Sequence, residues 1–330
     1  MELRPRVRIA VSGCLLGEDV RYDGGHRRSS YATDALGGAF ELVSECPEVG
    51  IGLGVPRPKI RLERSGGVTR LLDSREKDLT PVMDDYARQA ATRFAEARVA
   101  GIVLKSRSPS CGMGDVKLHA GGAVISEDGT GIFASRLAAA LPEAPRISET
   151  DLESPARRDH WLTRVFALAE IRELSSGSPD AAELYAFHAR WKMVLLAHSE
   201  RTARRLGRFL AATRDARDAL PRYREAFLAG LAEPASVGTH HNVLLHLAGH
   251  LRRPLDPAAR ERLRREIAAF LAREVPLATP VRSLSAWAAR LEVPSLGNQA
   301  YLAERPKSLA YREGIYPDEQ PVGTPAVTRR

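Results

Sequence analysis

The chain has 330 residues, of which 44% are hydrophobic and 27% are charged, a composition typical of globular proteins that excludes a disordered chain. No apolar run reaches the ~18 residues that a membrane-spanning helix needs, and the apolar run after "MELRPR" is too short for a signal peptide. We therefore expect a cytoplasmic protein without a membrane partner. The length is sufficient for two domains with separate cores.

The net charge of +8 is unevenly distributed. Residues 1–150 contain 21 Lys and Arg against 20 Asp and Glu, whereas the rest of the chain contains 28 against 21. A basic half suggests a polyanionic partner, with nucleic acid as the first candidate. A solvated, arginine-rich helical surface would have the same composition.

The first half alternates predicted strands and helices. Short apolar runs predict buried strands at 7–13, 40–45 and 101–106. Residues 81–101 repeat apolar side chains at helical spacing, and "ISEDGTGIF" predicts an Asp-Gly turn before a helix that begins near Ile132. This alternation predicts an α/β fold, a three-layer domain with a parallel sheet over residues 1–150.

Beyond residue 150 the pattern predicts helices only. We expect an all-α domain over 151–315, and the segment 316–330 lacks periodicity and predicts a disordered tail. The expected helices are 157–174, 180–197, 200–214, 219–232, 238–252, 257–273 and 280–292.

Each of the three cysteines follows a predicted strand. Cys14 follows the first strand, Cys46 the second, and Cys111 the third. Because the carboxyl ends of parallel strands meet at one edge of a sheet, the three thiols are expected to converge. Three widely spread cysteines do not form a disulfide framework. Cys111 ends the basic, Ser-rich stretch "KSRSPSCGMG", where we expect exposure and nearby cations to favour a reactive thiolate.

Several ligands are compatible with three converging thiols. A four-iron cluster held by three cysteines would leave one iron open as a Lewis acid. Zinc would need a fourth ligand such as His26, and close Cys-x-x-Cys pairs are absent. Ordinary core thiols, or one nucleophilic cysteine, fit the spacing equally well.

The cysteine loops also carry carboxylates, hydroxyls and cations. A carboxylate beside a hydroxyl can position and activate water, and cations can hold a phosphate. Simpler roles exist for each, because Asp23 before two glycines is typical of a turn and Ser110 of a turn cap. The candidates are Arg21, Asp23, His26, Glu45, Glu48, Arg57, Lys105, Arg107, Ser108 and Ser110.

The predicted helical domain carries a basic cluster. Four of its arginines recur at i, i+3, i+4 and i+7, so they share one helix face that suits phosphate contacts. A solvated face is the simpler alternative, because aromatic residues are not interleaved. The candidate nucleic-acid contacts are His188, Arg190, Lys192, His198, Arg201, Arg204, Arg205 and Arg208. His246 and His250 have metal-ligand spacing, but core packing or RNA contact is the simpler role for them.

Three motifs resemble a known family. "SGCLLGEDVRYDGGHR", "CPEVGIGLGVPRP" and "KSRSPSCGMG" are similar to the thiouracil desulfidase (TudS-like) family over residues 7–145. "FHARWKMVLLAHS" and "THHNVLLHLAGH" resemble the helical domain of the longer, RudS-like form, a tRNA 4-thiouridine desulfidase.

The resemblance implies a [4Fe-4S] cluster held by Cys14, Cys46 and Cys111, and non-redox removal of sulfur from thiolated uracil with release of hydrosulfide. It implies 4-thiouridine in tRNA as the substrate of the fused form. Carried over by position, Glu48 and Ser108 are the implied catalytic residues, and we add Asp23 from the first motif. The expected substrate contacts are Arg21, His26, Arg57, Lys105 and Arg107.

Two other functions fit the same residues. The first keeps the chemistry but acts on free thiouracil or a thiouridine monophosphate. The second is a regulator that binds nucleic acid and uses a cluster to sense the redox state. Thiolated tRNA is the expected partner of the enzyme, and DNA is not expected.

Overall fold

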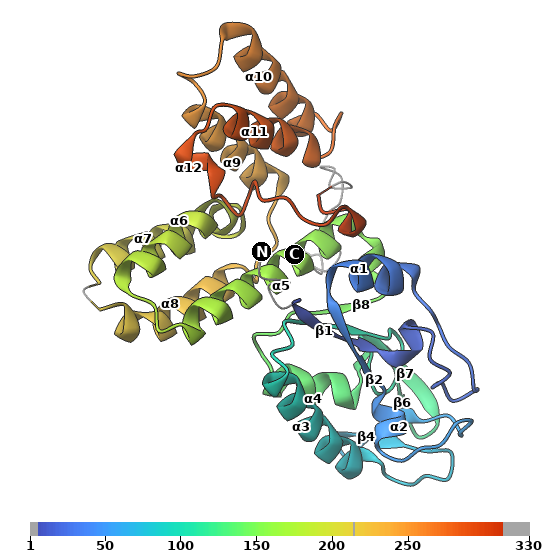
Figure 1. Cartoon of the computed structure of the whole chain (residues 1–330). Coiled ribbons are helices and arrows are strands. Elements are labelled where there is room, and N and C mark those ends of the chain that lie inside the picture. Colours follow the sequence, from blue (N-terminus) through green and yellow to red (C-terminus); the bar gives the residue numbers. More distant parts are fainter. Residues whose placement is uncertain (1–5, 214, 313–330) are drawn as a thin grey trace, which may run out of the picture. The chain divides into compact units, whose positions relative to one another are not determined.

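The computed structural model of the chain describes residues 6–213 and 215–312 (Figure 1). The chain divides into two compact units, Met1–Ser154 and Pro155–Arg330. The predicted tail at 316–330 lies outside the described residues. Within those residues, no helix is both long and apolar enough to cross a membrane.

The first unit is built on a four-stranded parallel sheet, as predicted. Ile9 in the central strand pairs with Leu42 on one side and with Gly101 on the other. Ile9, Val11 and Val103 are fully buried, which explains the continuous apolar runs in the sequence. In sheet order, the strands are β2 (Glu41–Glu45), β1 (Arg8–Ser12), β5 (Gly101–Leu104) and β8 (Arg146–Ser148).

Two amphipathic helices provide most of the packing around this sheet. The helix α3 (Thr80–Glu96) buries Met83, Ala87 and Phe94 at helical spacing, and α4 (Ile132–Ala140) begins at the predicted residue. Two short helices, α1 (Gly37–Ala39) and α2 (Pro47–Gly50), follow the first and second strands of the chain.

A second sheet in this unit was not predicted. It is mixed, with β3 parallel to β6 and antiparallel pairs at both edges. The hairpin turn that follows Ala120 lies at Gly121–Gly122, whose φ values of 59° and 84° suit glycine. The predicted Asp-Gly turn is wrong, because Asp128 and Gly129 lie within a strand. The strands are β4 (Val68–Leu72), β3 (Arg61–Ser65), β6 (Met113–Ala120) and β7 (Ala123–Thr130).

The second unit is helical, as predicted. The Asp180 side chain and Glu183 form a reciprocal capping box, so the second helix begins where the sequence indicates. Trp191, Tyr223 and Phe227 form an aromatic core, with the Trp191 and Phe227 ring centroids 5.8 Å apart. The helices are α5 (Pro155–Ser176), α6 (Ala181–His198), α7 (Glu200–Ala211), α8 (Ala216–Gly230), α9 (Val237–His250), α10 (Pro257–Leu271), α11 (Ala278–Arg290) and α12 (Pro294–Gly297).

Candidate active site

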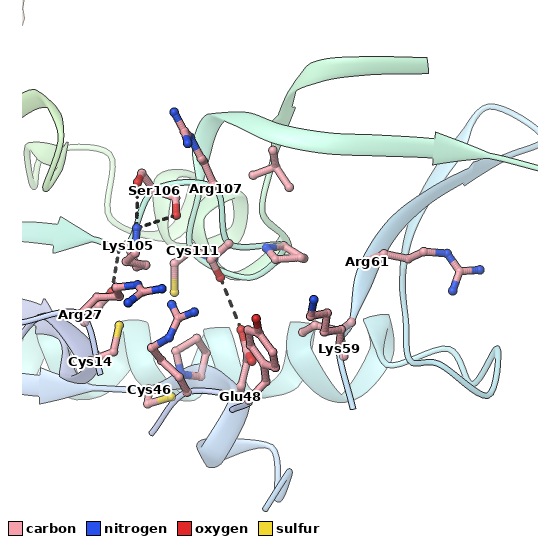
Figure 2. A pocket seen from close by; sticks show the side chains of 18 of the residues that line it. Cys14, Arg27, Cys46, Glu48, Lys59, Arg61, Lys105, Ser106, Arg107 and Cys111 are labelled. Atoms are coloured by element: carbon pink, nitrogen blue, oxygen red, sulfur yellow. Dashed lines mark hydrogen bonds between the residues drawn. The ribbon is translucent and has the colours of Figure 1, made fainter. Parts of the chain in front are cut away.

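The three cysteines line one cavity of about 1000 Å³ in the first unit (Figure 2). Cys14 lies in a 3-10 turn directly after β1, and Cys46 caps the N-terminus of α2 directly after β2. Cys111 lies in the loop between β5 and β6. The three thiols therefore meet where the carboxyl ends of parallel strands place them.

The cysteines are more deeply set than the sequence suggests. Cys111 is only 5% exposed and Cys14 only 9%, so the expected exposure of Cys111 is wrong. Burial is the main cause that raises the pKa of Cys14 to about 11, and the nearby Cys46 raises it further. Burial also raises the pKa of Cys111 well above its usual value, with Glu48, Cys14 and Cys46 adding to the effect. Metal binding here must therefore displace protons from the thiols.

Ser108 explains why the Cys111 loop folds inward. Its hydroxyl oxygen accepts hydrogen bonds from the backbone N–H groups of Ser110 and Cys111, both at 3.2 Å. Its carbonyl accepts a third from the backbone N–H of Gly112 at 2.8 Å. This local turn satisfies the loop's polar backbone and carries Cys111 into the protein.

The Glu48 carboxylate and Ser108 line the same cavity, and the fully buried Ser110 hydroxyl also contacts this carboxylate. The Oε1 atom of Glu48 accepts hydrogen bonds from the hydroxyls of Ser110 at 3.2 Å and Ser108 at 3.4 Å. The Oε2 atom accepts two from Arg57, at 3.0 and 2.7 Å. Arg57 therefore fixes one carboxylate oxygen, and the other faces the hydroxyls beside Cys111.

Arg57 is a structural centre of the pocket and not a plain surface arginine. Its side chain is 4% exposed. The guanidinium also donates to the carbonyls of Val20 at 2.9 Å and Gly54 at 3.2 Å, and its backbone N–H donates to the Tyr22 carbonyl at 2.8 Å. Arg57 thus ties the first cysteine motif to the second while it orients Glu48.

Two predicted cations of the third motif have different surroundings. The Lys105 ammonium forms an ion pair with Glu149, which also accepts a hydrogen bond from the backbone N–H of Ser106 at 2.7 Å. Arg107 is exposed, and its backbone N–H donates to Asp115 at 2.9 Å. Both line the cavity, but of these two cations Lys105 is paired, and Arg107 forms no ion pair with any side chain that the structure describes.

Asp23 and His26 are not among the residues that line the cavity, whereas Arg21 is. The Asp23 carboxylate accepts from the Gly25 N–H at 3.2 Å and pairs with Arg21 at 3.3 Å. The Gly25 hydrogen bond is the main cause that lowers the pKa of Asp23. His26 Nδ1 accepts from the Arg28 N–H at 3.2 Å. The structure therefore gives Asp23 the role of a turn residue.

Glu45, directly before Cys46, faces α3. Its carboxylate accepts hydrogen bonds from the Tyr86 hydroxyl at 2.5 Å and from Arg93 at 3.0 Å. A second cavity of about 460 Å³ lies here and is also lined by Cys46. Glu45 thus lines both cavities, and its hydrogen bonds hold the Cys46 loop to the helix.

Several residues that line the cavity were not predicted, and three of them lie in or beside the cysteine motifs. Arg27, Lys59 and Tyr22 line the cavity, and the Tyr22 ring lies 5.1 Å from the Lys59 ammonium and 5.4 Å from the Arg21 guanidinium. Each of the three lies inside or directly beside a quoted motif. Their positions in "RYDGGHRR" and "VPRPKI" could therefore have identified them as residues of the same cavity.

The predicted nucleic-acid contacts of the second unit separate into buried or half-buried residues with internal partners and exposed residues. His198 is 8% exposed, and its Nδ1 lies 2.7 Å from the Glu233 carbonyl. His188 contacts the Tyr223 hydroxyl at 3.1 Å, and Arg190 pairs with Glu170 at 2.9 Å. This placement argues against a nucleic-acid role for these three. The exposed members are Lys192, Arg201, Arg204, Arg205 and Arg208.

The possible metal ligands of the chain are His, Cys, Asp and Glu side chains. In the described ranges, no group of three His, Cys, Asp or Glu side chains is arranged to hold a metal ion. The His246 and His250 rings lie 5.6 Å apart in the second unit, and His250 Nδ1 lies 3.1 Å from the Ser295 hydroxyl. In a four-iron cluster each thiolate binds a different iron, so its cysteines need not meet at one point.

The first unit is therefore an α/β domain whose cavity is lined by three thiols and several cations. The same cavity contains the Glu48 carboxylate, which is paired with Arg57. A family model described as 2-thiouracil desulfurase matches residues 9–149, and a model described as a protein of unknown function (DUF1722) matches residues 192–306. The chain belongs to the 2-thiouracil desulfurase family, with a DUF1722 region following in the same chain.

Three individual proteins are similar to parts of the chain. The uncharacterized protein YbgA of Escherichia coli K12 is 31% identical over 157 residues, which are 47% of this chain and 93% of YbgA. The uncharacterized protein YbbK of Bacillus subtilis 168 is 28% identical over 32% of this chain and 74% of YbbK. A solved chain named as the [4Fe-4S]-dependent thiouracil desulfidase TudS is 32% identical, with a TM-score of 0.39, and the match covers 45% of this chain and 94% of that one.

Proposed function

We propose that the protein is an iron–sulfur desulfidase that removes sulfur from 4-thiouridine in tRNA without a net change in oxidation state. The family match to 2-thiouracil desulfurase supports the reaction class. The main support is that Glu48, Arg57 and Ser108 line the cavity that the three thiols line, with the buried Ser110 hydroxyl bonded to Glu48. A carboxylate beside a hydroxyl can position and activate the water that hydrolysis of a carbon–sulfur double bond consumes.

The donor set fits an iron–sulfur cluster. Thiolates are the usual ligands of such clusters, and Cys14, Cys46 and Cys111 come from three loops of one cavity. These three residues would hold the cluster. When bound, it would supply a soft Lewis acid for the sulfur of a thiocarbonyl.

The reaction balances as a hydrolysis. Water adds to the ring carbon that bears sulfur, the carbon–sulfur bond breaks, and a carbonyl forms. Sulfur leaves as hydrosulfide with its electron pair, so neither an oxidant nor a reductant is consumed. The products are uracil, as base or nucleotide, together with hydrosulfide and a proton.

The residues of this chain have distinct tasks in that reaction. Arg57 holds Oε2 of Glu48 through two hydrogen bonds, which leaves Oε1 to take a proton from the attacking water. The Ser108 hydroxyl touches Oε1 from the cavity wall and can pass a proton between Glu48 and the substrate ring, whereas the buried Ser110 hydroxyl holds Oε1 in place. Because Ser108 also accepts the Cys111 N–H, its hydroxyl and the Cys111 loop are held in one geometry.

The basic second unit supports tRNA as the substrate. On α7, Arg201, Arg204, Arg205 and Arg208 are exposed, and only Arg204 has a partner within the helix, Glu200. A helix face with this charge suits the phosphates of a folded RNA. A free nucleobase gains nothing from such a surface, so it is the weaker candidate.

The direct test is sulfide release under anaerobic conditions from three substrates: 4-thiouracil, 4-thiouridine monophosphate and tRNA that contains 4-thiouridine. We expect the largest kcat/KM for tRNA. Turnover of the small substrates alone would keep the chemistry and overturn the RNA substrate. Tight RNA binding without sulfide release from any substrate would favour a regulator.

A further inference from the structure

The cations that line the cavity fall into two groups. The first group consists of cations whose charge is already matched by a carboxylate. The pairs are Arg57 with Glu48 at 2.7 Å, Arg61 with Glu63 at 3.1 Å, Arg21 with Asp23 at 3.3 Å, Lys117 with Glu127 at 3.4 Å, and Lys105 with Glu149.

The second group has no carboxylate partner. Arg27, Lys59 and Arg107 also line the cavity, and all three are exposed. Across residues 6–213 and 215–312, none of them lies within ion-pair distance of an acidic side chain. Unpaired cations on the wall of a cavity attract anions, since the field inside a cleft is stronger than on an open surface.

The local structure anchors these three cations on different loops. Arg27 donates its backbone N–H to the Cys14 carbonyl at 2.8 Å, so it belongs to the first cysteine loop. Lys59 follows the Arg57 anchor, with its ammonium 5.1 Å from the Tyr22 ring. The Arg107 backbone has a φ of 57°, fixed by the Asp115 hydrogen bond. The three positions are therefore set independently of one another.

The arrangement surrounds the catalytic carboxylate. Figure 2 shows Arg27 and Lys59 on opposite sides of Glu48, with Arg107 apart from both. A single phosphate group cannot contact cations on both sides at once. The cavity of about 1000 Å³ is also much larger than a single nucleobase. A ligand that uses all three cations must carry anionic groups on both sides of the reacting base.

We infer that Arg27, Lys59 and Arg107 bind the phosphates that flank a thiolated nucleotide, and that this cavity selects an internal nucleotide of an RNA strand. The inference rests on the proposed function and adds the residues that choose among its substrates. The half-buried Tyr22 ring beside Lys59 lines the cavity and suits stacking of a neighbouring base, as in other single-strand binding sites. The first unit thus selects the RNA substrate through its own cavity. Contacts between the RNA and the helical unit would add to this selection.

The test compares two substrates in the whole protein with its cluster intact. One is a short oligonucleotide with one internal 4-thiouridine, and the other is 4-thiouracil. The measured quantity is kcat/KM for the oligonucleotide divided by kcat/KM for 4-thiouracil. We expect this ratio to fall about tenfold in each of the variants Arg27→Met, Lys59→Met and Arg107→Met, because each variant loses one charge-assisted hydrogen bond to the oligonucleotide. The matched controls Arg75→Met and Lys77→Met change exposed cations outside the cavity and should keep the ratio.

Binding of a fluorescent oligonucleotide at several salt concentrations gives a second readout. The slope of log K against log salt should become shallower by about 0.7 for each cation removed, and it should not change in the controls. An unchanged ratio and slope in all three variants would overturn the inference, as would an equal loss on both substrates. If the wild type releases no sulfide from any substrate, the proposed function fails, and the salt slope still decides whether these cations contact phosphate.

Discussion

Glu48 shows how one side chain acquires a function from its neighbours. Its two carboxylate oxygens have different partners, Arg57 on one and the Ser108 and Ser110 hydroxyls on the other. A carboxylate held this way keeps a fixed direction toward the substrate and retains an oxygen that can accept a proton.

We expect Glu48→Gln to lower the rate of sulfide release by about 100-fold or more, because an amide cannot take the proton of the attacking water. Iron content should stay at the wild-type value, since Glu48 is not a proposed ligand. Sulfide release under anaerobic conditions measures the first quantity and iron analysis the second. Glu41→Gln, at an exposed position paired with Arg8, is the matched control. A variant within a few fold of the wild type would remove Glu48 from the mechanism.

At the residue scale, the sequence predicted several of the residues that gather, but Asp23 and His26 lie outside the cavity, and the pairing of the residues was not predictable. Cys14, Cys46, Cys111, Glu48 and Ser108 line the cavity, because strand ends determine where loops meet. Hydrogen-bond partners depend on side-chain direction, which spacing along the chain does not encode. The Glu48 and Arg57 pair therefore emerged only from the structure.

At the scale of elements, the start of α4 supports the Cys111 loop. The N–H of Gly131 donates to the Gly112 carbonyl at 2.9 Å, and its backbone, with φ −60°, is open to any residue. A Cβ atom at this position would lie 2.4 Å from the Ser110 carbonyl and 2.8 Å from the Cys111 nitrogen. Both contacts are with backbone, so a side chain here must displace the loop.

Gly131→Ala should therefore lower iron content per chain after anaerobic reconstitution and destabilise the fold by about 1–3 kcal/mol, as overpacking does. Iron analysis and urea unfolding measure the two effects. Gly37→Ala is the control, because its Cβ would meet only the Leu42 side chain, at an ordinary 3.5 Å. Wild-type iron content in Gly131→Ala would show that the loop position does not determine cluster binding.

Helices were predictable and the second sheet was not. Capping residues such as Asp180 and Ser236, together with a 3.6-residue apolar period, locate helix ends within a few residues. Strand β7 has the burial pattern of an exposed edge strand and contains Asp128 and Gly129, which both favour turns. Strand β7 forms because it pairs with β6, and the local sequence of β7 does not reveal this pairing.

At the scale of the whole molecule, buried histidines couple the stability of the helical unit to pH. Burial is the main cause that lowers the pKa of His198 to about 3, and His160, stacked on it at 5.4 Å, lowers it further. Because the folded pKa lies below the unfolded value, this contribution to stability is full above about pH 6.5 and is lost as the pH falls from 6.5 toward 3.

The free energy of unfolding should therefore decrease as the pH is lowered from 7.5 to 5.5, by up to about 1.4 kcal/mol per pH unit for each such histidine. His198→Gln should make this dependence shallower. Asp159, whose pKa burial raises to about 6, acts in the opposite direction, so the difference between wild type and variant isolates His198. Urea unfolding followed by circular dichroism gives the slopes, and identical slopes would contradict a neutral His198.

Individual relatives match only parts of this chain. YbgA and YbbK each match less than half of this chain but most of their own length. A thiol-lined α/β unit and a basic helical unit occur here in one polypeptide. Under the proposed function, the helical unit would serve a tRNA substrate and not a small one.

The most direct measurement is the content of iron, zinc and acid-labile sulfide per chain in protein purified without oxygen. We expect about four iron and four sulfide per chain, and loss of both in Cys111→Ser. Zinc in place of iron, or no metal after anaerobic reconstitution with iron and sulfide, would contradict a cluster held by Cys14, Cys46 and Cys111.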